Sequence, residues 1–168
     1  FSKIVKLLIL TGQRKGEITN LTGGMIGDNT ITLPSWLTKN SRQHTIPLGS
    51  TARAILNPPL ARDAFFFPAL GKTTPFSGFS KCKACLDKPS GVSDWTLHDL
   101  RRSCATGMQR LSGAPHVVDL ALNHQEFLSG VAGVYLRHPY LEERRAALEL
   151  WARHLTQLSA PNQPSGVV

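Results

Sequence analysis

The chain has 168 residues, of which 41% are hydrophobic and 18% are charged. This length and balance suit one globular domain with a sizeable core and exclude an intrinsically disordered chain. Lys and Arg outnumber Asp and Glu by 19 to 11, which gives a formal net charge of +8. Such an excess favours a polyanionic partner, most often nucleic acid, with general solubility as the alternative reason.

The first segment, residues 3–10, is apolar on nearly every side and predicts a buried helix. It is too short to cross a bilayer and lacks a signal-peptide cleavage pattern. Because the sequence begins at Phe1 with a helix already under way, we expect the chain to be a fragment of a longer protein. Gly12 and Gly16 then flank Arg14, and both allow sharp backbone turns around it.

A small β-sheet is expected between Asn20 and Leu48. Apolar and polar residues alternate around Ile31 and again around Ile46, which is typical of antiparallel strands with one buried face. The residues "KNSR" lie at the tip of the predicted hairpin and place Lys39 in or beside an exposed turn.

Residues 51–56 predict a short helix, and the long segment after it is largely connecting chain, with a further helix at Ser80–Leu86. Cys82 and Cys85 have the spacing of a zinc knuckle, but no second pair follows, because Cys104 stands alone on a helix. We therefore expect ordinary thiols and no metal. Three cysteines also suggest no disulfide framework, which is typical of a reducing cytoplasm.

A strongly patterned helix begins after Thr96, which has the capping-box spacing with Asp99. Arg101 projects within the apolar stripe of this helix, and His98 lies at the edge of the stripe. A buried guanidinium needs a partner. That partner is either a core carboxylate such as Glu17 or a pair of phosphate oxygens. Five apolar residues form the stripe: Leu97, Leu100, Cys104, Met108 and Leu111.

Helices continue to Leu158, and the last one carries a second apolar stripe. Its members are Leu141, Leu148, Trp151, Leu155 and Leu158. Such a stripe most often covers the domain's own core. Residues 159–168 are expected to be a disordered tail. The predicted fold class is mainly α with a small antiparallel β-sheet (α+β), in one domain of residues 1–158.

Five segments supply polar residues in a distinctive order: "LTGQRKGEI", "LTKNSRQHTIPL", "WTLHDLRR", "LNHQ" and "GVAGVYLRHPYLEERR". The residues are Arg14, Lys39, His98, Arg101, His124 and Tyr135. As an ordered set they resemble the catalytic domain of tyrosine recombinases, the phage-integrase family. The segments from "WTLHDLRR" onward are most similar to integrases of prophages and genomic islands. The resemblance covers most of the chain, and the set is far more specific than any single member.

The resemblance implies which residues would hold the scissile phosphate of DNA. Arg14 and Arg101 would bind its non-bridging oxygens, and His124 would hydrogen-bond one of them. Glu17 would orient Arg14 from behind. A phosphodiester is anionic and repels a nucleophile, so fixed positive charge of this kind suits the chemistry.

The resemblance also implies which residues would move protons and form bonds. Lys39 would protonate the leaving 5′-oxygen, His98 would assist proton transfer near the nucleophile, and Tyr135 would attack phosphorus to give a 3′-phosphotyrosine. Of the chain's two tyrosines, Tyr140 is expected instead to pack at the start of the last helix. The covalent ester conserves bond energy, so resealing needs no ATP, and the arginines make a metal or other cofactor unnecessary.

Two features depart from the family pattern. The family usually has Leu-Gly-His where this chain has Leu122-Asn123-His124. Asparagine tolerates the left-handed conformation that the end of a helix requires, so we expect the change to be benign. The amino-terminal DNA-clamping domain of the family is not in this sequence.

Site-specific recombination of double-stranded DNA is therefore the leading interpretation. Relaxation of DNA as by a type IB topoisomerase and a non-catalytic DNA-binding regulator of the same fold are the alternatives. Arg42, His44 and Arg102 are further candidates for DNA contacts, with a structural role as the alternative for His44. The resemblance implies a homotetramer on synapsed DNA, a monomer without DNA, DNA-bending accessory proteins, and a cytoplasmic, nucleoid-associated location.

Overall fold

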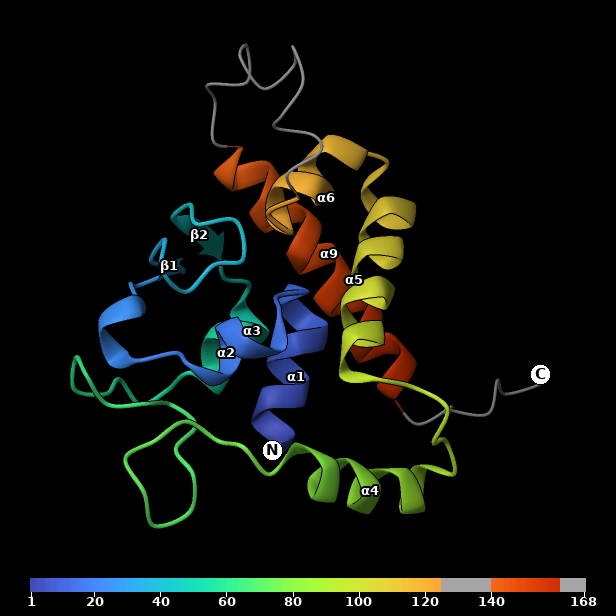
Figure 1. The fold of residues 1–168 in the computed structure, drawn as a ribbon. Coiled ribbons are helices and arrows are strands. Elements are labelled where there is room, and N and C mark those ends of the chain that lie inside the picture. Colours follow the sequence, from blue (N-terminus) through green and yellow to red (C-terminus); the bar gives the residue numbers. More distant parts are fainter. Residues whose placement is uncertain (125–139, 161–168) are drawn as a thin grey trace.

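The computed structural model describes residues 1–124 and 140–160 (Figure 1). The elements in these ranges are α1 (Ser2–Thr11), α2 (Lys15–Thr19), the 3-10 helix η1 (Gly23–Met25), β1 (Thr30–Leu33), β2 (His44–Pro47), α3 (Ser50–Ile55), α4 (Phe79–Ser90), α5 (Leu97–Ser112), α6 (Pro115–Ala121) and α9 (Leu141–Ser159). The predicted fold class, mainly helical with a small antiparallel sheet, is confirmed.

Helix α1 lies at the centre of the molecule, as its apolar sequence predicted (Figure 1). Ile4, Leu7 and Leu8 are almost fully buried. The helix packs against α2, α3, α5 and α9, so nearly every side of it meets another element. Only Ser2, Lys3 and Lys6 of the helix are exposed, so its polar side is narrow.

Helix α1 ends at Gly12, whose φ of 65° lies in the left-handed region. A side chain there would also collide with Leu122, whose Cδ2 lies 2.5 Å from the position of a Cβ atom. Gly12 therefore serves both the turn and the close approach. The prediction for Gly16 was wrong, because it lies inside α2 and makes no such turn.

The two strands pair antiparallel, with Ile31 opposite Ile46 and Leu33 opposite His44. Ile31, Leu33 and Ile46 are fully buried, so the apolar residues of the alternating pattern face the core. Residues 34–43 connect the strands, and Lys39 is exposed within this connection, as the hairpin prediction expected.

Helix α3 lies within one residue of its predicted range at each end, whereas α4 is longer than predicted. Helix α4 runs through Pro89 and ends at Ser90, and Gly91 caps it in the left-handed conformation. None of its residues is buried, so its apolar pattern was too weak to reveal the full length.

The predicted capping box of α5 is confirmed. One carboxylate oxygen of Asp99 accepts hydrogen bonds from the Thr96 hydroxyl at 2.6 Å and the Thr96 backbone N–H at 2.8 Å. These bonds lower the pKa of Asp99 to about 2. Cys104 and Met108 of the predicted stripe are fully buried, but Leu111 is 41% exposed, because the last turn borders an open groove.

Helix α9 packs within the same chain against α1, α5, α6 and β2. Leu148 and Trp151 are buried, and the Trp151 indole N–H donates to the carbonyl of Ile9 at 2.7 Å. Most of the predicted stripe therefore covers the domain's own core, while Leu158 at its far end is 69% exposed. No helix in residues 1–124 or 140–160 is long and apolar enough to cross a membrane.

Candidate active site

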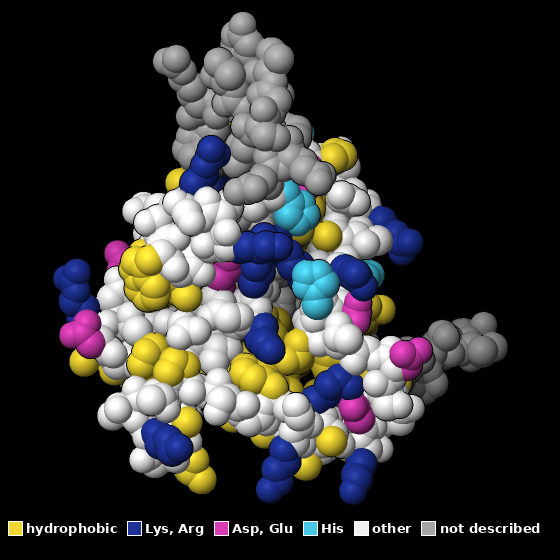
Figure 2. Space-filling model, viewed as in Figure 1, with side chains coloured by type: hydrophobic (Ala, Val, Ile, Leu, Met, Phe, Trp, Pro, Cys, Tyr) yellow, Lys and Arg dark blue, Asp and Glu magenta, His cyan; other side chains and the backbone are white. Residues whose placement is uncertain are grey.

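A cavity of about 670 Å³ opens where α2, α4, the hairpin turn and the start of α5 meet. Its lining includes five cationic residues and no carboxylate among the residues that the structure describes: Arg14, Lys15, Lys39, Lys83 and Arg101. His98 lies on the same wall. Figure 2 shows Lys, Arg and His side chains gathered near the middle of one face of the molecule. Four of the six residues singled out in the sequence thus share one electropositive cavity.

Arg101 is the most buried of these cations, at 6% exposed. Its Nη1 donates to the carbonyl of Gly12 at 2.7 Å and its Nη2 to the carbonyl of Leu122 at 2.6 Å. Both carbonyls follow the last turn of a helix, where the backbone dipole is negative. Burial, with a smaller contribution from the charge of Arg14, lowers the pKa of Arg101 to about 10, so it stays cationic at neutral pH.

Arg14 lies at the N-terminus of α2 and is held by Glu17. The Glu17 carboxylate accepts from the Arg14 backbone N–H at 2.9 Å and from its Nη1 at 3.1 Å. Glu17 is almost fully buried, whereas the Arg14 side chain is 27% exposed. Within the described chain, Glu17 therefore pairs with Arg14 and not with Arg101. The carboxylate partner considered for Arg101 is wrong, because that guanidinium binds two backbone carbonyls instead.

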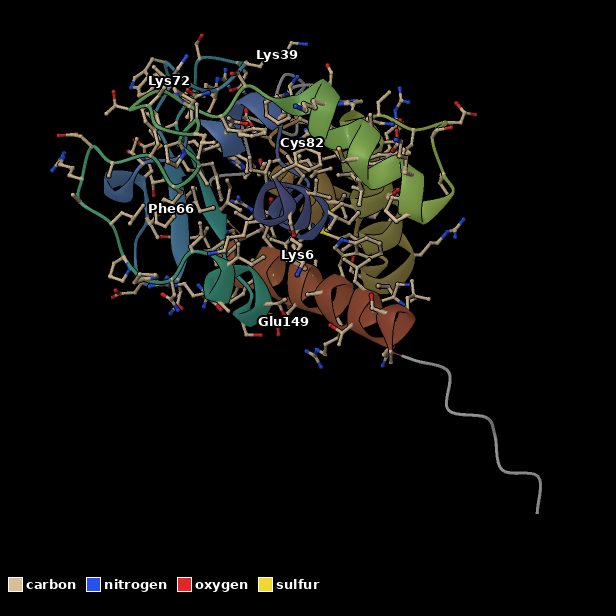
Figure 3. All side chains as sticks on the ribbon, turned by 90° about the horizontal axis from the view of Figure 1, so that it is seen from below. Lys6, Lys39, Phe66, Lys72, Cys82 and Glu149 are labelled. Atoms are coloured by element: carbon tan, nitrogen blue, oxygen red, sulfur yellow. The ribbon has the colours of Figure 1, made fainter. Side chains whose placement is uncertain are left out.

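Lys39 and His98 both line the cavity, from different elements, and both are exposed. Lys39 comes from the turn between β1 and β2, and Figure 3 shows it at the same edge of the molecule as α4. His98 lies in the first turn of α5, one turn before Arg101. An ammonium and an imidazole placed this way can exchange protons with a molecule bound between them.

His124 follows the end of α6 and is not part of the cavity lining. Its Nδ1 lies 2.8 Å from a carboxylate oxygen of Asp119, which accepts a hydrogen bond from the ring. The preceding residue, Asn123, has a φ of 56°, so the predicted left-handed conformation is confirmed. The backbone links His124 to Arg101 through the Leu122 carbonyl.

A buried polar cluster lies behind the cavity, at the carbonyl of Ala121. The Gln13 amide donates to this carbonyl at 3.0 Å, and His44 Nε2 lies 3.1 Å from it. Because a carbonyl only accepts, His44 must carry its proton on Nε2. His44 is 6% exposed, and this burial favours the structural alternative for His44 over a contact with DNA.

Folding stability should depend on pH through His44. Burial, followed by the charge of Arg144, lowers its pKa from 6.5 to about 3. The unfolded chain therefore takes up a proton below pH 6.5 that the folded chain refuses, so stability falls as the pH falls. One proton corresponds to about 1.4 kcal/mol per pH unit, or about 2 kcal/mol between pH 6.5 and 5.

The measurement is the free energy of unfolding in urea at pH 7 and pH 5. His44→Gln keeps an amide donor for Ala121 but cannot titrate, so it should lose about 2 kcal/mol less than the unsubstituted chain over this interval. Equal losses in the two proteins would show that His44 does not carry the dependence.

The wall formed by α4 is fixed by a compact set of contacts. Lys83 Nζ donates to Asp87 at 2.7 Å and lies 4.6 Å from the centre of the Trp95 ring. The Trp95 indole N–H donates to the same carboxylate at 2.9 Å. At the other end of α4, Lys15 lies over the Phe79 ring at 4.8 Å. These contacts hold an otherwise unburied helix beside the cavity.

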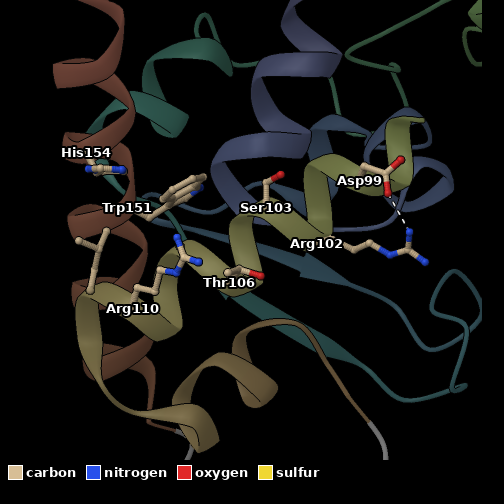
Figure 4. Close-up of a pocket in the computed structure, with 9 residues that line it drawn as sticks. Asp99, Arg102, Ser103, Thr106, Arg110, Trp151 and His154 are labelled. Carbon is tan, nitrogen blue, oxygen red and sulfur yellow. Dashed lines mark hydrogen bonds and ion pairs between the residues drawn. The ribbon is translucent and has the colours of Figure 1, made fainter. Parts of the chain in front are cut away.

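The remaining candidates for DNA contacts lie outside this cavity. Arg42 is exposed in the hairpin turn. Arg102 lines a second cavity, between α5 and α9, and pairs with Asp99 at 2.8 Å (Figure 4). Both side chains are accessible to a large partner.

Two further predictions concern the cysteines and the tyrosines. No group of three or more His, Cys, Asp or Glu residues in the described chain could hold a metal ion. Burial raises the pKa of Cys104 to about 12, which makes it an unreactive thiol.

Tyr135 lies outside the described residues. Tyr140 directly precedes α9, and its ring centre lies 5.5 Å from that of His116.

The sequence did not single out several residues that shape the site. Asn40 exchanges hydrogen bonds with Asn123, Asp119 holds His124, and Gln13 anchors the end of α6. The one available signal was that two of them stand next to a predicted site residue, because Asn40 follows Lys39 and Gln13 precedes Arg14. The partners of Asn40 and Gln13 are distant in the sequence, so nothing in the sequence indicated these two pairings.

Comparison with known proteins places these observations in a family. Residues 2–140 match the model of the phage integrase family. The chain is 32% identical over 165 residues to prophage integrase IntZ of Escherichia coli K12 and 30% identical over 123 residues to prophage integrase IntA of the same organism. These matches cover 94% and 71% of this chain.

The fold also matches a solved integrase from mycobacterium phage Brujita, with a TM-score of 0.65 at 19% identity. That match covers 94% of this chain and 57% of the other. The chain spans only 40% of IntZ and 30% of IntA. The family model covers most of the sequence and the fold agrees with it. The chain therefore belongs to the phage integrase family, as a tyrosine recombinase catalytic domain.

Proposed function

We propose that this chain is the catalytic part of a site-specific DNA recombinase that cleaves and rejoins DNA through a 3′-phosphotyrosyl intermediate. The observation that carries the proposal is the electropositive cavity in which Arg14 and Arg101 meet Lys39 and His98. Arg101 is buried without a carboxylate partner in the described chain, so its charge is available to an anion. A scissile phosphate fits this requirement.

In the proposed reaction, the phenol oxygen of Tyr135 attacks phosphorus and the bond from phosphorus to the 5′-oxygen breaks. His98 assists removal of the phenol proton, and Lys39 gives a proton to the departing 5′-oxygen. Arg14, Arg101 and His124 stabilise the negative charge on the non-bridging oxygens. Attack by a 5′-hydroxyl on the phosphotyrosine reverses these steps and reseals a strand without ATP.

Two other activities are the alternatives to recombination. Supercoil relaxation by a monomer would resemble a type IB topoisomerase, and binding without cleavage would make the chain a regulator. The similarity to two prophage integrases supports recombination. The proposal includes a homotetramer on synapsed DNA, monomers without DNA, accessory bending proteins and action at the nucleoid.

The test uses nicked duplexes tiled across the chromosomal DNA that flanks the gene. A nick close to the cleavage point releases a short fragment, so the covalent complex accumulates. We expect a protein–DNA adduct on a denaturing gel with only some of the duplexes. We also expect the same yield of adduct in EDTA, because guanidinium groups supply the positive charge that a metal ion would otherwise provide.

The three activities give different results in this assay. Adducts on every duplex, together with relaxation of plasmids of unrelated sequence, would indicate a topoisomerase. Retarded bands on native gels without any adduct would indicate a binding protein. A strict need for Mg²⁺ would contradict the proposed chemistry.

A further inference from the structure

We propose that Asn40 and Asn123 act as a clamp that positions Lys39 for proton transfer. The clamp joins the β1–β2 turn to the turn that carries His124. The inference rests on the proposed function, because it assigns the positioning of the acid in that reaction. Asn40 and Asn123 are positioning residues and do not themselves touch the reacting atoms.

The two side chains form a reciprocal amide pair. Asn40 Nδ2 donates to Asn123 Oδ1 at 2.7 Å, and Asn123 Nδ2 donates to Asn40 Oδ1 at 3.2 Å. Asn123 is 6% exposed and Asn40 is half-buried, so water competes weakly for these bonds. An amide offers both a donor and an acceptor, which is why two of them can close such a ring.

On the hairpin side, the clamp holds Asn40, the residue that follows Lys39. The preceding residue is also fixed, because the buried Thr38 hydroxyl donates to the Arg42 carbonyl at 2.7 Å and accepts from the Arg42 N–H at 3.1 Å. Lys39 therefore lies between two anchored neighbours although its own side chain is exposed. Without the amide pair, the Asn40 side chain would keep only the longer bond that its Oδ1 accepts from the Arg42 N–H at 3.4 Å, which lies within the turn and does not tie it to Asn123.

On the other side, the clamp acts on the turn between Arg101 and His124. The Leu122 carbonyl accepts from Arg101, and His124 pairs with Asp119. Asn123 stands between these two anchors with a φ of 56°. Glycine, which the family usually has here, would adopt this backbone but offer no side chain. The asparagine therefore adds a link from the phosphate-binding turn to the acid.

Loss of the clamp is expected to change the rate of DNA cleavage. A general acid accelerates a reaction only when it lies within hydrogen-bond distance of the departing atom. Loss of the clamp should leave Lys39 chemically intact but less often in place, which slows cleavage by about 10- to 100-fold. The loss should be smaller than that caused by removing Lys39 itself.

The experiment compares Asn123→Gly, Asn40→Ala, the double variant and Lys39→Ala in single-turnover cleavage. Each is tested on ordinary nicked DNA and on DNA with sulfur in place of the bridging 5′-oxygen. A thiol has a pKa of about 8.5, far below that of an alcohol, so it departs without a proton donor. We expect all four variants to be slow on ordinary DNA and to approach the unsubstituted rate on the sulfur substrate.

The double variant should be no slower than the slower single variant, because both substitutions break one contact. Asn20→Ala is the matched control, since its amide donates to the Gly16 carbonyl at the end of α2 and makes no contact with the clamp, and it should change nothing. Unsubstituted rates for Asn123→Gly on ordinary DNA would overturn the inference. A slow rate that persists on the sulfur substrate would also overturn it, because the defect would then lie outside proton donation.

A second measurement does not depend on catalysis. Trypsin should cut after Lys39 or Arg42 several-fold faster in Asn123→Gly than in the unsubstituted chain without DNA, because the turn opens more often. Equal cutting rates would overturn the clamp. If the unsubstituted chain forms no adduct with either substrate, the proposed function fails, and trypsin still decides whether the clamp exists.

Discussion

Arg101→Lys is expected to slow single-turnover cleavage of DNA by about 10²- to 10⁴-fold, although the positive charge is retained. Arginine binds the carbonyls of Gly12 and Leu122 through two nitrogens and keeps further N–H groups for a phosphate. A lysine ammonium is a single point and cannot reach both carbonyls and an oxyanion together. The measurement is the rate of adduct formation at saturating protein.

The same substitution should also lower stability, by about 2–4 kcal/mol in urea unfolding. Arg101 joins the end of α1 to the end of α6, and the lysine leaves at least one of two buried carbonyls without its charged donor. A rate that stays within about threefold of the unsubstituted chain would contradict a phosphate-binding role, because one such contact alone is typically worth 10²-fold or more.

Arg102→Lys is the matched control on the same helix. Arg102 is exposed and pairs only with Asp99 in the described chain. Exposed ion pairs contribute about 0–1 kcal/mol, so its stability should hardly change. At saturating protein the cleavage rate should remain close to that of the unsubstituted chain, even if Arg102 contacts the DNA backbone.

Elements with strong local patterns could be predicted from the sequence. The apolar segment of α1, the alternation in β1 and β2, and the capping box at Thr96 each reflect contacts between residues close in the chain. The stripe of α9 also predicted its packing correctly up to Leu155. Such features follow from the helical and strand periods, which act within one element.

The interior of the site could not be predicted in this way. His44 is a polar residue on a short strand, and nothing nearby in the sequence indicates that its ring faces the Ala121 carbonyl. The pairs Asn40–Asn123 and Arg101–Leu122 likewise depend on how hairpin, α5 and α6 come together. The Arg14–Glu17 pair was accessible because it spans less than one helical turn.

Tyr135→Phe is expected to abolish the covalent adduct while leaving DNA binding intact. The substitution removes only the phenol oxygen, the atom that would bond to phosphorus, and keeps the ring. Other groups in the site can stabilise charge or move protons, but none of them replaces this bond. The measurement pairs a denaturing gel for the adduct with a native gel for binding, both in EDTA.

Tyr140→Phe is the matched control, because it removes the same atom from the chain's other tyrosine. Tyr140 directly precedes α9 and its ring lies beside His116, so the Phe ring should preserve this packing and the adduct should form. Trypsin cuts after Arg137, which places the two tyrosines in different peptides, and mass spectrometry can then locate the attached nucleotide. An adduct that survives in Tyr135→Phe and disappears in Tyr140→Phe would assign the nucleophile to Tyr140. The reaction would then have to bring the residue that precedes α9 to the cavity of Arg14 and Arg101.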